Sequence, residues 1–349
     1  MNEQWKTFLE TQGAQFGDQG VADFGDPANE RRQARDGLVL CDLSHYGLIR
    51  GQGGDAQSFF QGQFSNDVAQ VSPQRSQLNS YNSPKGRAYA VFRLFQDDTH
   101  WYLRLPREVL EPTLQRLKMF VLRSDVTLED ASDERIIAGL AGPGSDELLK
   151  GALGGAPADI DDVTHQDGIT AIRVPGPAPR FELHGEPQAM QALWSKLAGQ
   201  AKPTGGGVWE WLDIQAGLTN VFAATREEFV LQMINFQLVG GVSFTKGCYP
   251  GQEVVARMHY LGNLKKRSFI AHVDSDQAPA INDDLFSPEA GKNQSIGQVV
   301  NAQPSPDGGY DLLAVIQIAV AEEHPVHLRD AEGPVLGLRE LPYPAVLEK

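Results

Sequence analysis

The stretch from Gly240 to Arg257 reads GGVSFTKGCYPGQEVVAR and is the most unusual in the chain. Its glycines and its proline specify the backbone closely, because glycine permits left-handed turns and proline fixes φ. Pro250 suits the first position of a helix whose apolar face would carry Val254, Val255 and Met258. The pattern predicts a loop followed by a helix, with Cys248 just before that helix.

Cys248 has two readings at such a position. The free amide groups and positive end of a helix lower the pKa of a nearby thiol below its free value of about 8.5, and Lys246 lies two residues away. A reactive thiolate is one interpretation. A buried structural cysteine is the other, and spacing alone favours it by roughly two to one because free cysteine is among the most buried residue types.

Charge sets the same region apart. The segment from Lys246 to Arg267 carries a net charge of +4 in a chain whose net charge is -15. Such an island on an acidic protein suits a polyglutamylated cofactor or a phosphate backbone. For the run from Lys265 to Arg267 alone, a solvated surface is the favoured alternative.

Outside this segment the hydrophobic pattern predicts an α+β protein. Apolar short runs alternate with helical patterns in two successive modules, and alternating strands follow Leu264, which is typical of a small β-barrel or sandwich. The predicted parts are an N-terminal arm (1–36), a first α+β unit (37–130), a second α+β unit that carries the cysteine segment (131–262) and a β-barrel (263–349).

Particular elements follow from local spacing. The arm carries a helix around Trp5, Phe8 and Leu9, and a Gly/Asp-rich loop follows it through Pro27. Further helices are expected after Asp55, from 110 to 121 and from 190 to 197. Strands are expected at 136–140, 181–183, 269–273, 296–300, 310–320 and 335–338.

Composition excludes several classes of protein. The longest nearly apolar run, Leu312 to Ala321, is half the length of a membrane-spanning helix, so we expect a soluble protein with no membrane partner. The N-terminus has no signal or transit pattern, and cytoplasmic residence is expected. Cys41 and Cys248 lie far apart with no clustered ligands, so neither a disulfide scaffold nor a metal site is expected.

The block Lys246–Glu253, followed by Ala256-Arg257 and Leu261-Gly262, resembles the signature of the YgfZ family of folate-binding proteins, relatives of the glycine-cleavage T-protein, an aminomethyltransferase. Further matches are Asp42–Gly47, Gly54–Gln63, Asn66–Val68 and the ending Leu341–Pro344. The cysteine block is specific to the family, whereas the motif around Asp55 is shared across the wider superfamily. The resemblance covers roughly 37–130 and 205–344.

The resemblance implies two ferredoxin-like α+β units and a C-terminal β-barrel around a central channel that receives tetrahydrofolate or a derivative. Cys248 is the candidate catalytic residue. The candidate cofactor-binding residues are Lys246, Tyr249, Gln252, Glu253, Arg257, Gln215, Arg87, Asn66 and Trp209. Arg87, Asn66, Trp209 and the further candidate Asn82 each have a structural reading of at least equal weight.

Two departures from the T-protein pattern leave enzymatic activity open. The T-protein has an Asp after a hairpin glycine, but here the corresponding stretch Asn82–Ala90 carries none, and no acid occurs between Asp67 and Asp97. A general base or acid contributes about 10² to 10⁴ in rate, so ordinary aminomethyl transfer is disfavoured. Gln215 replaces a Glu that meets the pterin and cannot supply a charge-assisted bond.

The family resemblance implies an accessory role in assembling or repairing iron–sulfur clusters in enzymes, including those that thiolate transfer RNA. The expected partners are such enzymes or cluster-assembly proteins. One thiol cannot hold a cluster, which normally takes four cysteines, so any contact would be transient or shared. An active folate-dependent aminomethyltransferase or demethylase is the alternative. Direct contact with transfer RNA ranks third, because no RNA-reading signature is visible.

Overall fold

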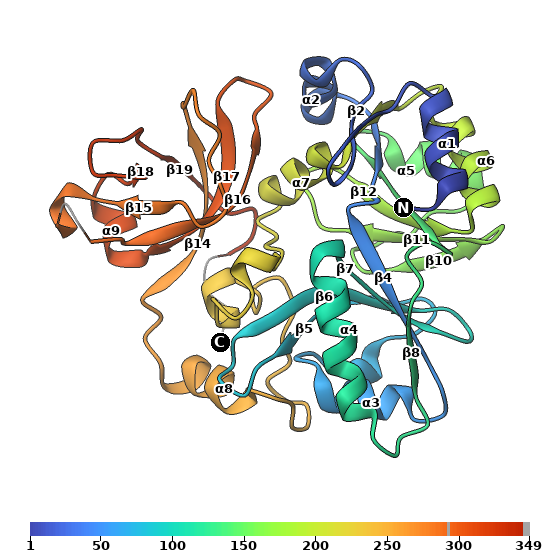
Figure 1. Ribbon diagram of the computed structural model, residues 1–349, viewed down its shortest axis with the longest axis horizontal. Helices are drawn as coiled ribbons and strands as arrows, with labels where there is room; N and C mark the ends of the chain where they lie inside the picture. Colours follow the sequence, from blue (N-terminus) through green and yellow to red (C-terminus); the bar gives the residue numbers. More distant parts are fainter. Residues whose placement is uncertain (292–293, 345–349) are drawn as a thin grey trace. The chain divides into compact units, whose positions relative to one another are not determined.

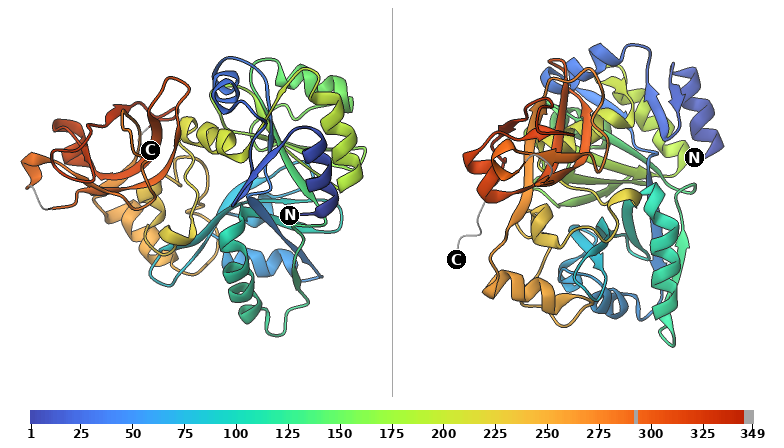
Figure 2. Two further views of the ribbon diagram at one scale, coloured as in Figure 1. Left: turned by 45° about the horizontal axis from the view of Figure 1, so that its top comes forward. Right: turned by 60° about the vertical axis from the view of Figure 1, so that its left-hand side comes forward.

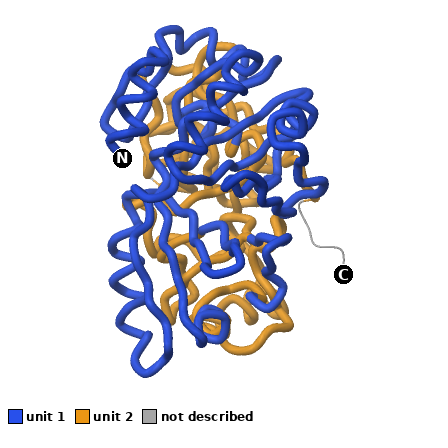
Figure 3. Tube along the Cα trace, turned by 90° about the vertical axis from the view of Figure 1, so that its right-hand side faces the viewer, with its two compact units in different colours: residues 1–60, 68–77, 92–212 blue, residues 61–67, 78–91, 213–349 orange. Residues whose placement is uncertain are grey.

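The computed structural model describes residues 1–291 and 294–344, which form two compact units (Figure 3). Unit 1 consists of 1–60, 68–77 and 92–212, and unit 2 consists of 61–67, 78–91 and 213–349. Each unit therefore collects segments that are separated in the sequence. The domain boundaries expected after 36, 130 and 262 stay predictions.

A six-stranded sheet forms the centre of unit 1 (Figure 1). Its order is β10 (Val163–Gln166), β11 (Ile169–Val174), β12 (Arg180–Gly185), β9 (Ile136–Ala141), β3 (Val39–Asp42) and β13 (Lys202–Thr204). Only the β3–β13 pair is parallel; the other pairs are antiparallel. Every residue of β9 and β12 is buried, because packed side chains cover both faces of the sheet.

The predicted N-terminal helix is confirmed as α1 (Glu3–Thr11), which packs against α6 (Pro187–Leu197). Asn2 caps α1 by accepting a hydrogen bond from the backbone N–H of Trp5. The Trp5 ring meets Trp194 edge-on at 5.4 Å, and its indole N–H donates to Asp42 over 2.8 Å. The arm is thus part of the unit 1 core. The loop expected after it instead contains a small hairpin, β1 (Gln15–Gly17) and β2 (Gly20–Asp23).

A second large sheet has five strands. Its order is β5 (Gln77–Asn82), β6 (Ala88–Gln96), β7 (Trp101–Pro106), β4 (Tyr46–Gln52) and β8 (Thr127–Asp130). The helices expected near 56 and 110–121 are confirmed as α3 (Ala56–Gln63) and α4 (Arg107–Val121). The remaining helices are α2 (Pro27–Asp36), α5 (Ser145–Leu153), α7 (Gly206–Gln215), α8 (Gln252–Leu261) and α9 (Ile318–Glu323), with short 3-10 turns at Val68–Gln70, Ala223–Thr225, Leu231–Ile234 and Pro288–Ala290.

The C-terminal part of unit 2 is a curled antiparallel sheet with the form of a half-barrel, as both views of Figure 2 show. Its order is β18 (His327–Leu328), β15 (Asp284–Phe286), β16 (Gly297–Pro304), β17 (Tyr310–Gln317), β14 (Lys266–Val273) and β19 (Gly337–Arg339). The prediction of one long strand over 310–320 was wrong about where the strand ends. It stops at Gln317, and the apolar run continues as α9, because a short apolar run has no period that separates strand from helix.

Several ionisable groups are buried in unit 1. The side chain of His45 is 9% exposed, and Gly206 packs so closely on its ring that a Cβ there would lie 2.4 Å from Nδ1. Burial lowers the pKa of His45 to about 3, and the Arg104 guanidinium adds to the effect. Burial also lowers the pKa of His184. Both imidazoles are therefore neutral in the folded protein at neutral pH.

We expect acid to destabilise unit 1 through His45. Between pH 6.5 and about 3 the unfolded chain protonates His45 while the folded chain does not, so folding stability is lost as the pH falls through this window. His45→Gln should reduce the loss by about 1 kcal/mol per pH unit below 6. Urea unfolding at pH 7, 6, 5 and 4.5 measures it. Parallel pH profiles for the variant and the wild type would contradict the expectation.

Candidate functional site

The cysteine-bearing segment of unit 2 is held by one buried ammonium group. Lys246 Nζ donates hydrogen bonds to the carbonyl oxygens of Gln61 (2.7 Å), Phe64 (2.7 Å) and Asn66 (2.8 Å). These carbonyls belong to the last turn of α3 and the residues after it, where a helix leaves carbonyl groups without intrahelical donors and carries partial negative charge. All three ammonium protons are used in this way.

Burial alone would disfavour the charged lysine. It lowers the pKa of Lys246 to about 8, and the carboxylate of Asp67 opposes the shift. The three carbonyl oxygens compensate the desolvated charge, and the ring of Tyr249 lies 5.3 Å from Nζ. Tyr249 is itself buried, which raises the pKa of its phenol to about 12. Lys246 thus has a demonstrated structural role, and its binding to a cofactor stays a prediction.

Asn66 and its neighbour Ser65 fasten the same loop at its beginning. The Asn66 side-chain amide donates to the carbonyls of Leu78 (3.0 Å) and Gly240 (2.7 Å). The Ser65 hydroxyl donates to the carbonyl of Gly241 over 2.7 Å, and the Ser65 carbonyl accepts from the backbone of Ser243. Hydrogen bonds therefore join residues 61–66 to residues 240–246. These two hydrogen bonds from the Asn66 side-chain amide both go to backbone carbonyls.

Two glycines allow the other side of the loop to approach the β5–β6 hairpin closely. Gly251 has φ +79°, and a Cβ on it would lie 2.5 Å from the Ser83 carbonyl oxygen. Gly86 has φ +70°, and a Cβ there would lie 2.8 Å from the Cβ of Val254. Only glycines permit this approach. It places the turn Ser83–Gly86, which contains no Asp or Glu, against the start of α8.

The predicted position of the helix was wrong by two residues. Gly251 is the N-cap and α8 begins at Gln252, so Pro250 precedes the helix instead of opening it. The left-handed conformation of Gly251 produces a turn that the proline pattern did not reveal. Cys248 consequently lies in the loop, with an exposed and unbonded side chain, between the buried residues Lys246 and Tyr249. The buried structural reading of Cys248 is excluded in this conformation.

The other candidates in this segment lie around the cysteine loop. Gln252 and Glu253 occupy the first turn of α8, and Arg257 is exposed one turn later. Arg87, on the strand side of the hairpin turn, donates to the carbonyls of Glu227 (3.2 Å) and Glu228. Arg87 thereby ties the hairpin to the 223–230 segment. The roles of these residues toward a cofactor stay predictions.

Gln215 is the last residue of α7, and its amide is oriented by a buried carboxylate that sequence reasoning missed. Gln215 Nε2 donates to Asp311 over 3.2 Å. Asp311 is 1% exposed and also meets His272 (2.8 Å) and Arg339 (3.1 Å). The available signal was an acid within the apolar run of β17. With its N–H held by Asp311, Gln215 has its amide oxygen left as an acceptor.

Unit 2 also contains polar atoms that lack a partner, as a ligand site would. Among the described residues, Asn82 Nδ2 and Thr219 Oγ1 are buried and form no hydrogen bond. The Asn82 side chain is fixed by the Ser80 hydroxyl, which donates to its oxygen over 3.0 Å. A buried donor without an acceptor costs about 1–3 kcal/mol. Asn82 Nδ2 and the amide oxygen of Gln215 are a donor and an acceptor of the kinds that the nitrogen and oxygen atoms of a pterin require.

Trp209 is the one cofactor candidate in unit 1. It is fully buried within the unit 1 core, and the guanidinium of Arg180 lies 4.3 Å from its ring. A Cβ on Gly139 would lie 2.4 Å from the ring, so the strand glycine makes room for the indole. Trp209 has the contacts of a core residue, and its place in a cofactor site stays a prediction.

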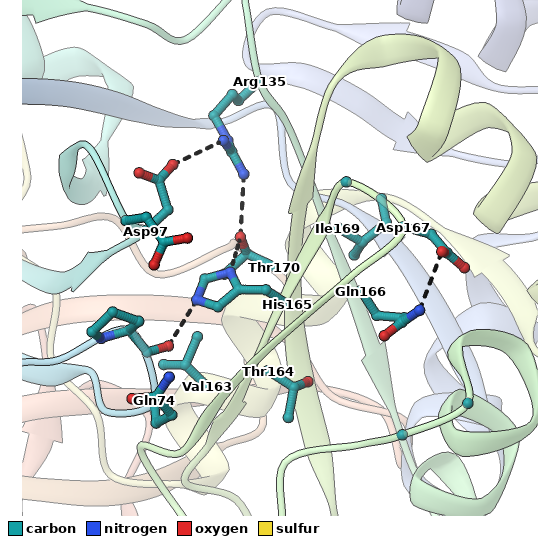
Figure 4. A pocket seen from close by; sticks show the side chains of 15 residues that line it. Gln74, Asp97, Arg135, Val163, Thr164, His165, Gln166, Asp167, Ile169 and Thr170 are labelled. Atoms are coloured by element: carbon teal, nitrogen blue, oxygen red, sulfur yellow. Dashed lines mark hydrogen bonds and ion pairs between the residues drawn. The ribbon is translucent and has the colours of Figure 1, made fainter.

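A separate open pocket in unit 1, with a volume of about 790 Å³, contains none of the predicted residues (Figure 4). Arg135 donates to Thr170 over 3.2 Å and lies 3.6 Å from Asp97. His165 in turn meets the hydroxyl of Thr170 (3.0 Å) and the carbonyl of Pro73 (2.7 Å). Arg135, Asp97, Thr170 and His165 are thus linked to one another at this pocket, although Arg135 Nε has no hydrogen-bond partner among the described residues.

No helix in 1–291 or 294–344 is both long and apolar enough to cross a membrane. Over the same residues, no group of three or more His, Cys, Asp or Glu side chains is arranged to hold a metal ion.

The sequence and the fold are similar to those of known proteins. The family model of the GCVT N-terminal domain matches residues 8–173. The glycine cleavage system aminomethyltransferase T from Bartonella henselae has the same fold, with a TM-score of 0.75 and 18% identity over 98% of this chain and 97% of that one. The fold is thus that of the T-protein class, as predicted.

Curated relatives define the family more closely. The tRNA-modifying protein YgfZ of Sodalis glossinidius is 31% identical over 88% of this chain and 93% of its own length. The protein of that name from Shigella boydii is 30% identical over 91% and 97%. The chain belongs to the YgfZ family, which confirms the resemblance found in the cysteine block.

We expect the Lys246 ammonium to be a main source of stability in unit 2. Lys246→Met keeps the length of the side chain but removes the charged donor that three carbonyl oxygens share. Hydrogen bonds to charged groups are worth about 1.5–3 kcal/mol each, and partial rehydration recovers some of that. The free energy of unfolding in urea should therefore fall by about 3 kcal/mol.

Lys265→Met is the matched control, because Lys265 is exposed and forms no ion pair in the described chain. Its free energy of unfolding should stay within about 0.5 kcal/mol of wild type. Equal stability of the two variants would show that the three carbonyl bonds do not hold the loop.

Proposed function

We propose that this protein is a folate-binding accessory factor for the assembly or repair of iron–sulfur clusters in enzymes, including enzymes that thiolate transfer RNA. Cys248 is the reactive group of this factor. Membership of the family supports the proposal that the protein binds folate, and the relatives' name links them to tRNA modification. The iron–sulfur role and the reactivity of the thiol are the parts that experiments must test.

The observation that carries the proposal is the exposed thiol of Cys248 on a loop fixed from both ends. Lys246 anchors one side, two residues before the sulfur, and the close contact of Gly251 with Gly86 anchors the other. A surface cysteine with no hydrogen bond contributes little to stability. A fold that holds such a cysteine on a rigid loop presents it to an external species.

Tetrahydrofolate, when bound, would supply a carrier for one-carbon units. In unit 2, Asn82 would donate to the pterin or its substituents through the free Nδ2 atom, and Gln215 would accept through its amide oxygen. Asp311 fixes the direction of the Gln215 amide. Arg257 is an exposed cation that would suit the anionic glutamate tail of the cofactor.

The hairpin turn argues for an accessory role rather than aminomethyl transfer. The turn Ser83–Gly86 contacts the start of α8, at the place where the T-protein pattern has its Asp, and it contains no acid. No carboxylate of this turn can take or give a proton at a reacting nitrogen. The hairpin of the transferase fold is therefore present, but the carboxylate of the T-protein pattern is missing from it.

The first experiment concerns Cys248. Cys248→Ala should abolish the in-cell activity of iron–sulfur enzymes that depend on the protein and leave the melting temperature within about 2 °C, because the thiol is exposed and unbonded. Complementation of a deletion strain measures this. Thr245→Ala, a change at another exposed residue of the same loop, is the matched control and should complement fully. Full activity of Cys248→Ala would refute the proposal.

The second experiment tests the cofactor by calorimetric titration with tetrahydrofolate. Asn82→Leu removes the free donor and should weaken binding by about tenfold, since a lost hydrogen bond to a ligand costs roughly 1–1.5 kcal/mol. Ser80→Ala keeps Nδ2 of Asn82 and should change affinity by less than about threefold. Equal affinities of all three proteins would remove Asn82 from the site.

The same samples discriminate the alternative function. An active aminomethyltransferase would convert tetrahydrofolate and an aminomethyl donor into methylene-tetrahydrofolate and ammonia, and a demethylase would move a methyl group from its donor to tetrahydrofolate to give methyl-tetrahydrofolate, so both products are assayed. We expect none above the uncatalysed background. Turnover that survives in Cys248→Ala would favour the alternative.

A further inference from the structure

The end of α8 carries a cluster of aromatic rings at the surface. Phe244, from the loop before the cysteine, stacks on His259 with ring centroids 3.8 Å apart and planes 15° from parallel. Tyr260 meets the His259 ring nearly at right angles over 4.7 Å. Tyr260 is 65% exposed, so the cluster is preorganised and still presents a free ring to solvent.

Three cations lie close to these rings along the chain, Arg257 three residues before Tyr260 on α8 and Lys265 and Lys266 five and six residues after it. Arg257 and Lys265 are exposed, Lys266 is half-buried, and none of the three forms an ion pair within the described residues. Elsewhere arginines are commonly neutralised: Arg50 lies between Glu129 and Glu134, and Arg104 pairs with Glu182. The α8 surface therefore keeps positive charge on a chain whose net charge is -15.

This combination selects among possible occupants. A purely apolar protein groove would leave three cations desolvated without compensation, which is costly. A single-stranded nucleic acid satisfies both features, because unstacked bases have faces that stack on aromatic rings and phosphates neutralise the cations. Duplex RNA is disfavoured, since its bases are already stacked and its deep groove excludes side chains.

We propose that the α8 surface, formed by Phe244, Arg257, His259, Tyr260, Lys265 and Lys266, binds a single-stranded RNA segment. A base stacks on Tyr260, and adjacent phosphates contact the cations. The proposal deepens the proposed function by naming an RNA contact surface on the segment that carries Cys248, and it requires no bound folate. RNA is favoured over DNA because the curated relatives are named as tRNA-modifying proteins.

The surface escaped sequence reasoning for a physical reason. Phe244 and His259 are 15 positions apart, and only the turn at Gly251 folds the loop back along α8 so that their rings meet. The basic residues were visible in the sequence, but the rings that accompany them come partly from the other side of the cysteine.

The test uses fluorescence anisotropy of a labelled RNA hairpin with a seven-nucleotide loop. With three phosphate contacts, affinity should fall about 20-fold between 50 and 200 mM salt. A fully paired RNA duplex of the same length should bind at least tenfold more weakly. Tyr260→Ala should weaken hairpin binding about tenfold, since base–aromatic stacking is worth about 1–3 kcal/mol, whereas Tyr260→Phe should retain it.

The cations are tested separately. The double change Lys265→Gln and Lys266→Gln should flatten the slope of log affinity against log salt by about 1.4. Leu122→Ala is the control, because Leu122 is an apolar residue of unit 1 that is 85% exposed, more than Tyr260, and lies outside the proposed surface. It should bind RNA like the wild type.

No binding of the hairpin at 50 mM salt would overturn the proposal, and so would equal binding of hairpin and duplex or an unchanged affinity in Tyr260→Ala. Tetrahydrofolate titration of the same variants keeps the two proposals apart. Tyr260→Ala should bind folate normally, so loss of RNA binding alone leaves the folate proposal standing, and loss of folate binding in the wild type leaves the RNA result standing.

Discussion

The ammonium group of Lys246 is the interaction on which the rest of unit 2 depends. It joins the last turn of α3 to a loop about 180 residues later, and its three protons match three carbonyl oxygens. Arginine could not reproduce this, because its planar guanidinium directs its donors in a fork instead of a cone. The helix end, the β5–β6 hairpin and α8 are all positioned through this loop. The exposed sulfur of Cys248 is thereby held by neighbours that are themselves buried.

The proposal that this T-protein fold has an accessory role rests on two parts of unit 2. The turn between β5 and β6 retains the tight contact with Gly251, which places it against α8, but it presents Pro84 and Lys85 to solvent and no carboxylate. Gln215 retains a polar group at the end of α7, with its direction fixed by Asp311. Under the proposed function, Gln215 remains available to a cofactor while the carboxylate expected from the T-protein pattern is absent from the turn.

Much of this organisation could be predicted from the sequence. The α+β class, the N-terminal helix and the cysteine loop follow from periodicity and from the glycines and proline of 240–251, because these residues act through local backbone preferences. The start of α8 could not be placed, since the left-handed φ of Gly251 depends on packing against Gly86. The partners of Lys246 are backbone carbonyls, which leave no mark in a sequence. Asp311 was missed because its partners come from three distant segments.

The interleaving of the two units has a consequence for synthesis. The chain passes between unit 1 and unit 2 five times, and residues 61–67 and 78–91 belong to a unit whose remainder begins only at 213. During translation these early segments must wait for more than a hundred residues before their partners leave the ribosome. Lys246 itself is among the late arrivals. Neither unit can be excised as one continuous fragment. A truncation or gene fusion that cuts the chain between two of these segments would therefore leave parts of both units in each fragment or remove part of one unit.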